Sequence, residues 1–187
     1  MIKRLFDIVF SLILLVILLV PMILIAILVK SSSKGQVLYW SQRVGKDNIT
    51  FRMPKYRTMI ASTPPVASHL LSNPEFILTP NGNFLRKYSL DEFPQLWSII
   101  KGDMSFVGPR PALFNQEDLI TLRTNNGVDK LLPGLTGLAQ INGRDELPIP
   151  EKVKMDLEYL ERQSFFFDLQ ILWKTFIKVI KRDGISH

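Results

Sequence analysis

The longest apolar stretch of the chain lies near its N-terminus. Within residues 8–29, only Ser11 and Pro21 are not plainly apolar. As a helix, a run of this length can cross about 30 Å of hydrocarbon. No small-residue cleavage site follows a short apolar core, so the run does not match a removed signal peptide. The pattern therefore predicts a membrane helix.

The flanks of this run leave two dispositions open. A single spanning helix is the simpler one. Lys3 and Arg4 precede the run, and Lys30 and Lys34 follow it, so the positive-inside rule gives no preferred orientation. Pro21 removes a backbone hydrogen bond in mid-helix and favours a kink. We therefore expect a re-entrant helix that enters and leaves on the same side.

A second apolar segment, residues 165–180, lies near the C-terminus and carries basic residues at roughly helical intervals, among them Lys174 and Lys178. Asp168 is its expected N-cap and Gly184 its expected stop. A basic helix with bulky aromatic residues suits the bilayer interface. Packing on the domain's own core explains part of this face equally well.

The more polar middle of the chain predicts a small mixed domain. Residues 37–40 and 49–53 are expected strands on either side of a turn at residues 45–48. Residues 91–100 and 151–162 are expected helices, because apolar positions recur on one face.

Two segments rich in proline, glycine and small polar residues, 60–83 and 127–150, are expected loops. The predicted class is α+β, mainly helical. Residues 1–33 form the membrane element, and residues 34–187 form one small domain that ends in the interfacial amphipathic helix.

Composition narrows the function classes. The chain has 187 residues, a net charge of +6 and no cysteine, which excludes disulfides and thiolate chemistry. The positive charge suits an anionic membrane surface, nucleic acid or phosphorylated substrates. Because the membrane segment does not fit a nucleic-acid partner, we expect none.

The candidate chemistry concentrates at Asp91 and Glu92. Ser89 and Glu92 have the spacing of a capping box, whereas Asp91 as N-cap would put Pro94 where its missing N–H is harmless. Either choice leaves both carboxylates at the positive end of a helix dipole. A carboxylate there can attack phosphorus or bind Mg²⁺. The plainer alternative is a pair that only caps a helix.

Cationic residues elsewhere in the chain favour a phosphate site. Arginine has a planar fork that suits phosphate oxygens, and a rigid turn such as that around Arg110, between two prolines, lowers the entropy cost of positioning it. A loop at residues 133–144 contains glycines that let the backbone approach a ligand. The candidate substrate-binding residues are Lys55, Arg57, Arg86, Arg110, Gln140 and Arg144.

The chain resembles the bacterial sugar transferases, the monotopic phosphoglycosyl transferases that start glycoconjugate assembly on polyprenol phosphate. The similarity covers almost the whole chain in order. Its motifs are Lys3-Arg4-x-x-Asp7, Arg43-Val44-Gly45, Lys55-x-Arg57-Thr58-Met59, Leu85-Arg86-x-x-Ser89-Leu90-Asp91-Glu92-x-Pro94-Gln95, Lys101-Gly102-Asp103-Met104-Ser105-x-Val107-Gly108-Pro109-Arg110-Pro111, Pro133-Gly134-x-Thr136-Gly137 and Ser164-Phe165-x-x-Asp168.

The resemblance implies a reaction and roles for the site residues. Asp91 would attack the β-phosphorus of a UDP-sugar, expel UMP and pass the phosphosugar to polyprenol (undecaprenyl) phosphate. Glu92 would deprotonate the acceptor or orient the site, and Mg²⁺ would lie beside Asp91. Lys55, Arg86 and Arg110 would contact phosphates, and Arg144 the nucleotide end.

The resemblance also implies the place of action, which is the bacterial inner membrane with a cytoplasmic catalytic domain. The product would enter O-antigen, capsule, exopolysaccharide or glycoprotein synthesis, and the oligomeric state stays open, a homodimer included. Two other classes compete with this reading. One is a membrane-bound glycosyltransferase that releases UDP, and the other is a non-catalytic membrane-surface binding module.

Overall fold

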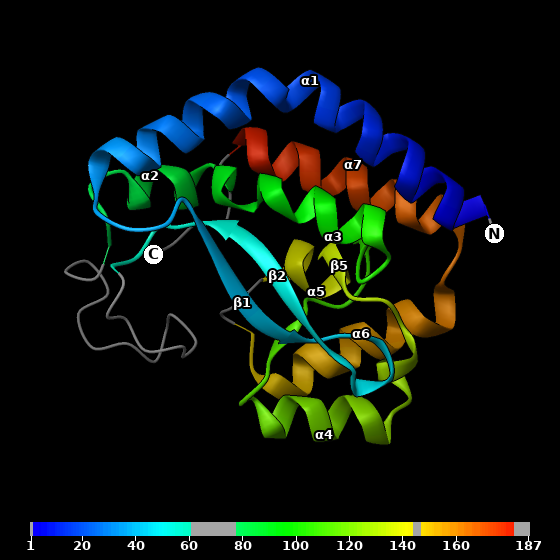
Figure 1. Cartoon of the computed structure of the whole chain (residues 1–187). Helices are drawn as coiled ribbons and strands as arrows, with labels where there is room; N and C mark the ends of the chain where they lie inside the picture. The colour runs from blue at the N-terminus through cyan, green and yellow to red at the C-terminus, as the bar shows by residue number, and fades with distance from the viewer. Residues whose placement is uncertain (1, 61–77, 144–146, 182–187) are drawn as a thin grey trace.

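The computed structural model describes residues 2–60, 78–143 and 147–181. Within these ranges the protein is mostly helical and has two small sheets, which confirms the expected α+β class (Figure 1). The expectations for Arg144, for Gly184 and for most of the predicted 60–83 loop lie outside the described residues.

A β-hairpin forms most of the larger sheet. β1 (Leu38–Val44) pairs antiparallel with β2 (Thr50–Tyr56) along the full length of both strands. The short β4 (Ala112–Leu113) joins the end of β1, so the strand order is β2-β1-β4. The turn η1 (Lys46–Asn48) closes the hairpin, with Asp47 at a left-handed φ of 54°. Both predicted strands and their turn are confirmed, and each strand is longer than expected.

The smaller sheet corrects one expectation. Residues 127–150, expected to be mostly loop, contribute a strand that pairs in parallel with β3 (Ser105–Val107). Gly134 suits this strand because a side chain there would collide with the crossing backbone: the Gly108 nitrogen lies 2.1 Å from the position of a Cβ. The segment holds three short elements before its final helix, η5 (Val128–Lys130), β5 (Gly134–Thr136) and α5 (Leu138–Asn142).

The helix expected to begin at Asp91 consists of two elements. A 3₁₀-helix, η4 (Leu90–Gln95), comes first and α3 (Leu96–Lys101) continues it. Ser89 precedes η4 in a left-handed conformation, and its side chain makes no capping bond, so both capping expectations were wrong. Pro94 lies inside η4, where its missing N–H removes one hydrogen bond of the helical backbone.

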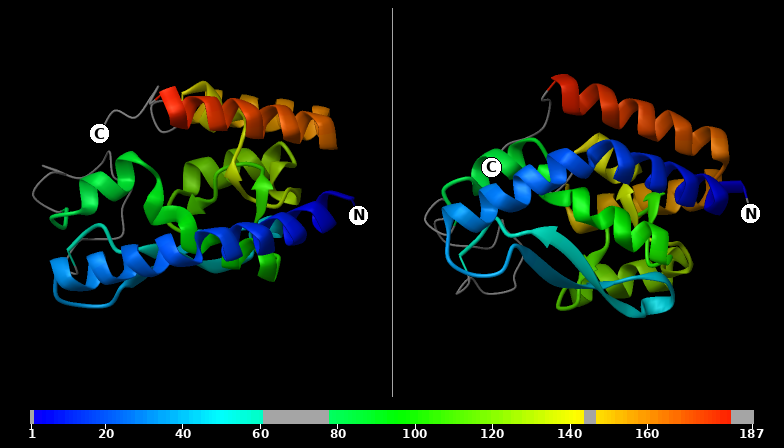
Figure 2. Two further views of the ribbon diagram at one scale, coloured as in Figure 1. Left: turned by 90° about the horizontal axis from the view of Figure 1, so that it is seen from above. Right: turned by 45° about the horizontal axis from the view of Figure 1, so that its top comes forward.

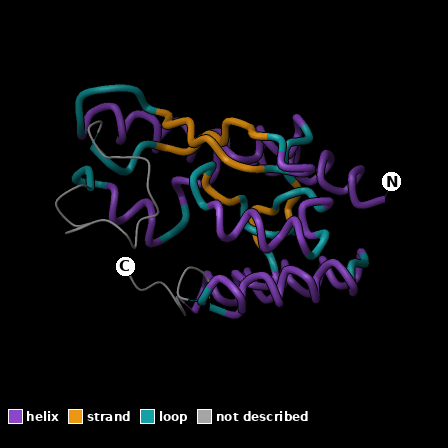
Figure 3. The backbone as a smooth tube through the Cα atoms, turned by 90° about the horizontal axis from the view of Figure 1, so that it is seen from below, coloured by secondary structure: helices purple, strands orange, loops and turns teal. Residues whose placement is uncertain are grey.

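The remaining helices pack around these sheets. Figure 3 shows the strands as short segments and helix as the greater part of the chain. The helix predicted over residues 151–162 is confirmed and starts two residues earlier. The helices are α2 (Gly82–Lys87), α4 (Glu117–Asn125), α6 (Ile149–Arg162) and α7 (Phe165–Lys181).

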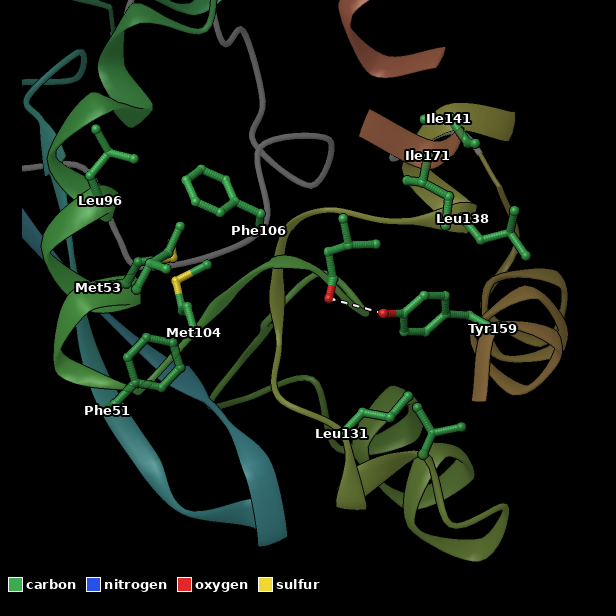
Figure 4. Packing of buried hydrophobic residues seen from close by; sticks show 13 residues of the cluster. Phe51, Met53, Leu96, Met104, Phe106, Leu131, Leu138, Ile141, Tyr159 and Ile171 are labelled. Atoms are coloured by element: carbon green, nitrogen blue, oxygen red, sulfur yellow. Dashed lines mark hydrogen bonds between the residues drawn. The ribbon is translucent and has the colours of Figure 1, made fainter. Parts of the chain in front are cut away.

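One hydrophobic core joins the hairpin to the C-terminal half. Phe51 and Met53 of β2 pack with Ile99 of α3 and Phe106 of β3, and Tyr159 of α6 lies fully buried in the same cluster. Figure 4 shows Tyr159 pointing from α6 toward β3, where its hydroxyl meets a backbone carbonyl. This shared core holds β2, α3, β3 and α6 together.

The N-terminal apolar run is the arched helix α1 (Ile2–Ser32), which continues through Pro21 (Figure 1). Its buried residues lie toward its two ends. Asp7 accepts a hydrogen bond from the Phe106 amide at 3.1 Å near one end, and Val29 packs beside Tyr56 and Leu85 near the other. The helix therefore rests along the domain with both ends attached to it.

Helix α7 begins beside the N-terminal end of α1, and the two helices run along opposite edges of the molecule seen from above (Figure 2, left). Asp168 was expected to cap α7, and this was wrong. Ser164 is the capping residue, because its hydroxyl accepts the Phe167 amide at 3.2 Å. Asp168 lies inside the first turn, where it is buried and pairs with Lys3.

Candidate active site

The candidate site forms where η4 crosses the end of β2. The left-handed Ser89 turns the chain so that Asp91, the second residue of η4, points inward and is only 6% exposed. Burial raises the pKa of Asp91 to about 6, because the charged carboxylate loses water. No hydrogen bond joins its carboxylate to another of the described residues.

Three cations surround Asp91 and act on it at longer range. The charge of Lys55 opposes the rise in the Asp91 pKa most strongly, and Arg86 and Arg110 oppose it less. The neighbouring Glu92 works in the other direction and raises this pKa further. The result is an anion held in a positive environment without being directly bonded.

Glu92 is the bonded member of the acidic pair. The Lys55 Nζ donates to its Oε1 at 2.9 Å, and an Arg110 side-chain nitrogen lies 3.6 Å from the same oxygen. Lys55 comes from β2 and Arg110 from the turn between β3 and β4. Three segments distant in sequence therefore converge on Glu92, and this convergence could not be derived from one sequence.

Arg86 reaches the site from α2. Its Nε donates to the Thr58 hydroxyl at 3.1 Å, just beyond β2. Its charge still lowers the pKa of Asp91, so the guanidinium belongs to the same positive environment. The Arg110 side chain is 38% exposed, against 15% for Lys55, which leaves it accessible to a ligand.

Arg57, one of the candidate substrate-binding residues, contacts the segment just after α1 instead of the acidic pair. Arg57 is buried, and its guanidinium donates to the carbonyls of Lys34 at 2.5 Å and Ser33 at 2.9 Å, just past α1. It is not among the charges that act on Asp91. These contacts suit an anchor for the C-terminal end of α1.

Gln140 lies buried in α5. Its amide nitrogen donates to the Leu135 carbonyl at 3.3 Å, and its side-chain oxygen has no partner among the described residues. Gln95 in η4 is also buried, and its amide nitrogen has no such partner. The sequence motif contains Gln95, four residues after Asp91, but only the structure gives it this unpaired donor next to the site.

Comparisons with known proteins identify the family of the chain. The family model for bacterial sugar transferases matches residues 1–182. The chain belongs to the bacterial sugar transferase family.

Three relatives show how the match is distributed. The uncharacterized sugar transferase EpsL of Bacillus subtilis is 36% identical over all of this chain and 91% of its own length. The UDP-galactose-lipid carrier transferase of Erwinia amylovora is 36% identical over 98% of this chain. The UDP-glucose:undecaprenyl-phosphate glucose-1-phosphate transferase of Escherichia coli is 38% identical over 95% of it. The chain spans less than half of the last two relatives, 41% and 40% of their lengths.

In this sugar transferase, α1 is the candidate membrane element. Of the described helices, only α1 is long and apolar enough to cross a membrane. Most of its surface is uncovered, with Val16 78% exposed and Val20 65% exposed. A helix with so much bare apolar surface indicates membrane association.

Proposed function

We propose that this sugar transferase moves a phosphosugar from a UDP-sugar to polyprenol (undecaprenyl) phosphate. The products are polyprenol-diphosphate-sugar and UMP. The observation that carries the proposal is the buried Asp91 carboxylate, unbonded and surrounded by Lys55, Arg86 and Arg110. Family membership supports the reaction class, and the names of two relatives contain UDP-galactose or UDP-glucose with a lipid carrier or undecaprenyl phosphate.

The proposed reaction has two steps. In the first, an Asp91 carboxylate oxygen bonds to the β-phosphorus of the donor, and the bond from that phosphorus to the UMP oxygen breaks. UMP leaves with the electron pair, and the sugar phosphate stays on Asp91 as an acyl phosphate. In the second step, a phosphate oxygen of the polyprenol phosphate attacks the same phosphorus and releases Asp91.

The cations suit the charge that develops in both steps. The ammonium group of Lys55 and the guanidinium of Arg110 already meet at Glu92, so their charges are in place before the substrate arrives. Arg86 adds a third charge from α2. Glu92 holds Lys55 and Arg110 in place and is the candidate to accept the acceptor's proton. Gln140 stays a candidate substrate-binding residue, and Arg144 stays a candidate for the nucleotide end.

The donor set suits Mg²⁺ only in part. Among the described residues, no cluster of three or more His, Cys, Asp or Glu could hold a metal ion. Mg²⁺ in phosphoryl-transfer sites often takes one or two carboxylates and completes its shell with water and substrate phosphates. Asp91, with Glu92 next to it, fits that pattern. Bound there, Mg²⁺ would offset the charge of the donor diphosphate.

The proposed location is the bacterial inner membrane, with residues 34–187 on the cytoplasmic side. Because α1 is attached to the domain toward both ends, a re-entrant course explains its contacts better than a straight span does. Helix α7 adds exposed aromatic residues suited to the lipid interface, Phe166 at 77% and Trp173 at 63%. A polyprenol acceptor would then reach the site from the membrane.

The proposal is tested by intact-mass spectrometry of the purified protein. The protein is incubated with Mg²⁺ and a panel of UDP-sugars, without a lipid acceptor. We expect a mass increase equal to one sugar phosphate with a suitable donor, and no increase in the Asp91→Asn variant. Release of UDP instead of UMP on addition of polyprenol phosphate would contradict the proposal. So would full activity of Asp91→Asn.

A further inference from the structure

The backbone of the turn that carries Arg110 is held at four successive residues. The Gly108 amide donates to the Thr136 carbonyl at 2.9 Å, and the Pro109 carbonyl accepts the Gly134 amide at 2.9 Å. Side chains hold the next two positions. The Arg110 carbonyl accepts from Arg123 at 2.8 Å, and the Pro111 carbonyl accepts from Arg43 at 3.1 Å.

Arg123 is itself fixed by a buried carboxylate. Its Nε and one terminal nitrogen donate to the same Asp156 oxygen at 2.9 and 2.7 Å, and its other terminal nitrogen is the one that reaches Arg110. The side chain of Asp156 is only 2% exposed. Arg123 comes from α4 and Asp156 from α6, so this ion pair ties two helices to the turn.

The hydrogen bond from Arg123 constrains the backbone of Arg110, which the two neighbouring prolines fix only in part. Pro111 restricts Arg110, the residue before it, to extended conformations, and within that range the contacts of Arg110 set its dihedral angles. The Arg123 hydrogen bond fixes the direction of the Arg110 carbonyl. This in turn aims the Arg110 side chain, one of whose nitrogens lies 3.6 Å from Glu92. Through Asp156 and Arg123, α6 is therefore connected to the residue whose side chain reaches Glu92.

We infer that Arg123, held by the buried Asp156, is a positioning residue that aims Arg110 at the Asp91–Glu92 pair. The inference rests on the proposed function, in which Arg110 meets the substrate phosphates. Arg123 contacts the backbone of Arg110 and not the reacting atoms, so its whole contribution to catalysis passes through the Arg110 side chain.

A double-mutant cycle tests this inference. The paired replacement Arg123→Met with Asp156→Leu removes both charges, so that neither helix keeps a lone buried charge that would prevent folding. In the wild-type background we expect kcat to fall about tenfold, a coupling of the size seen between contacting groups. In the Arg110→Ala background the same replacement should change kcat by less than about twofold. Equal losses in the two backgrounds would overturn the inference, because a general structural defect acts regardless of Arg110.

Hydrogen exchange of the turn gives a readout that does not need activity. The paired replacement should speed exchange in the peptide that contains residues 108–113 and leave the peptide of β1 and β2 unchanged. Lys130→Met, which removes an exposed cation paired with Asp47 and Asp129, is the control and should alter neither exchange nor kcat. Unchanged exchange in the turn would overturn the inference. A wild-type protein without transfer activity would contradict the proposed function alone, since exchange would still decide the role of Arg123.

Discussion

Asp91 and Asp168 are both buried carboxylates with cations close by, but they differ in their direct hydrogen bonds. Asp168 accepts from the Lys3 ammonium at 2.5 Å and from the Tyr159 hydroxyl at 2.6 Å. Asp91 is similarly buried, but its cations act only at longer range and its pKa is raised to about 6. The first carboxylate joins α7 to α1 and α6, and the second accepts no hydrogen bond from the residues that the structure describes.

The difference separates a structural carboxylate from one that is a candidate for chemistry. A buried charge that is fully bonded holds its elements together, and losing one partner is expensive. A buried charge without direct partners costs stability in the folded protein, and such groups concentrate at functional sites. The contrast between the two aspartates therefore supports the choice of Asp91 as nucleophile without reference to any motif.

The largest effect on stability is expected at Asp168. Replacing it with leucine leaves the Lys3 ammonium and the Tyr159 hydroxyl without their carboxylate in a mostly buried setting. We expect the free energy of unfolding to fall by about 3 kcal/mol, the range measured when one partner of a buried pair is removed. Urea denaturation in detergent measures this loss. A change below about 1 kcal/mol would show that the pair is not buried in the membrane-bound protein.

A replacement of Asp91 is expected to raise the free energy of unfolding rather than lower it. The folded-state pKa of Asp91, about 6, lies above the ordinary value of 3.8, so the folded protein binds more protons than the unfolded chain between these values. Stability therefore decreases as pH rises through this window, and above it the ionised carboxylate costs ~3 kcal/mol. Asp91→Asn should raise the stability at pH 8 by this amount, and the gain should vanish below about pH 4.

Thermal denaturation of Asp91→Asn and wild type across this pH range measures the difference. Glu92→Gln is the matched comparison, because Glu92 is directly bonded to Lys55. We expect this second replacement to destabilise the protein at pH 8. Opposite changes in the free energy of unfolding for these two neighbouring replacements would support the contrast between the two carboxylates. Changes of the same sign would contradict it.

The sequence was sufficient to predict the elements that have a clear hydrophobic pattern. The hairpin, α6 and the apolar α1 follow from hydrophobic pattern and turn residues, and these predictions are confirmed. Residues 127–150 were harder, because the strand β5 depends on the crossing of Gly108 over Gly134. Contacts between distant segments override local propensity there.

The site shows the same limit. Asp91 and the cations were named from the sequence, but their convergence comes from the placement of β2, α2 and the Arg110 turn around η4. From the sequence alone, Lys3 and Arg4 are only charges that flank a membrane helix. Both are instead bound to the domain, with Arg4 donating to the last carbonyls of α3, at Ile99 and Ile100. Charge counting cannot detect such tertiary partners.

Arg57 extends the comparison to cations. Arg86 and Arg110 act on Asp91, whereas the guanidinium of Arg57 is bonded to the Ser33 and Lys34 carbonyls. We expect Arg57→Met to lower the free energy of unfolding by about 1.5 kcal/mol, the usual size for hydrogen bonds from a charged donor. The KM for the UDP-sugar should stay within about twofold of wild type, since no binding contact is lost. A large rise in KM at unchanged stability would return Arg57 to the substrate-binding residues.

The smallest effect is expected at Glu158, which precedes the buried Tyr159 on α6. Glu158 pairs with Arg162 one helical turn later, and both side chains are about half exposed, at 46% and 57%. Glu158→Gln should lower the free energy of unfolding by only about 0.4 kcal/mol, because water solvates Arg162 when its partner is lost. Urea denaturation of this variant and of Asp168→Leu compares two ion pairs that are both in direct contact but differ in burial. Equal losses would contradict the view that burial, rather than contact, sets the worth of an ion pair here.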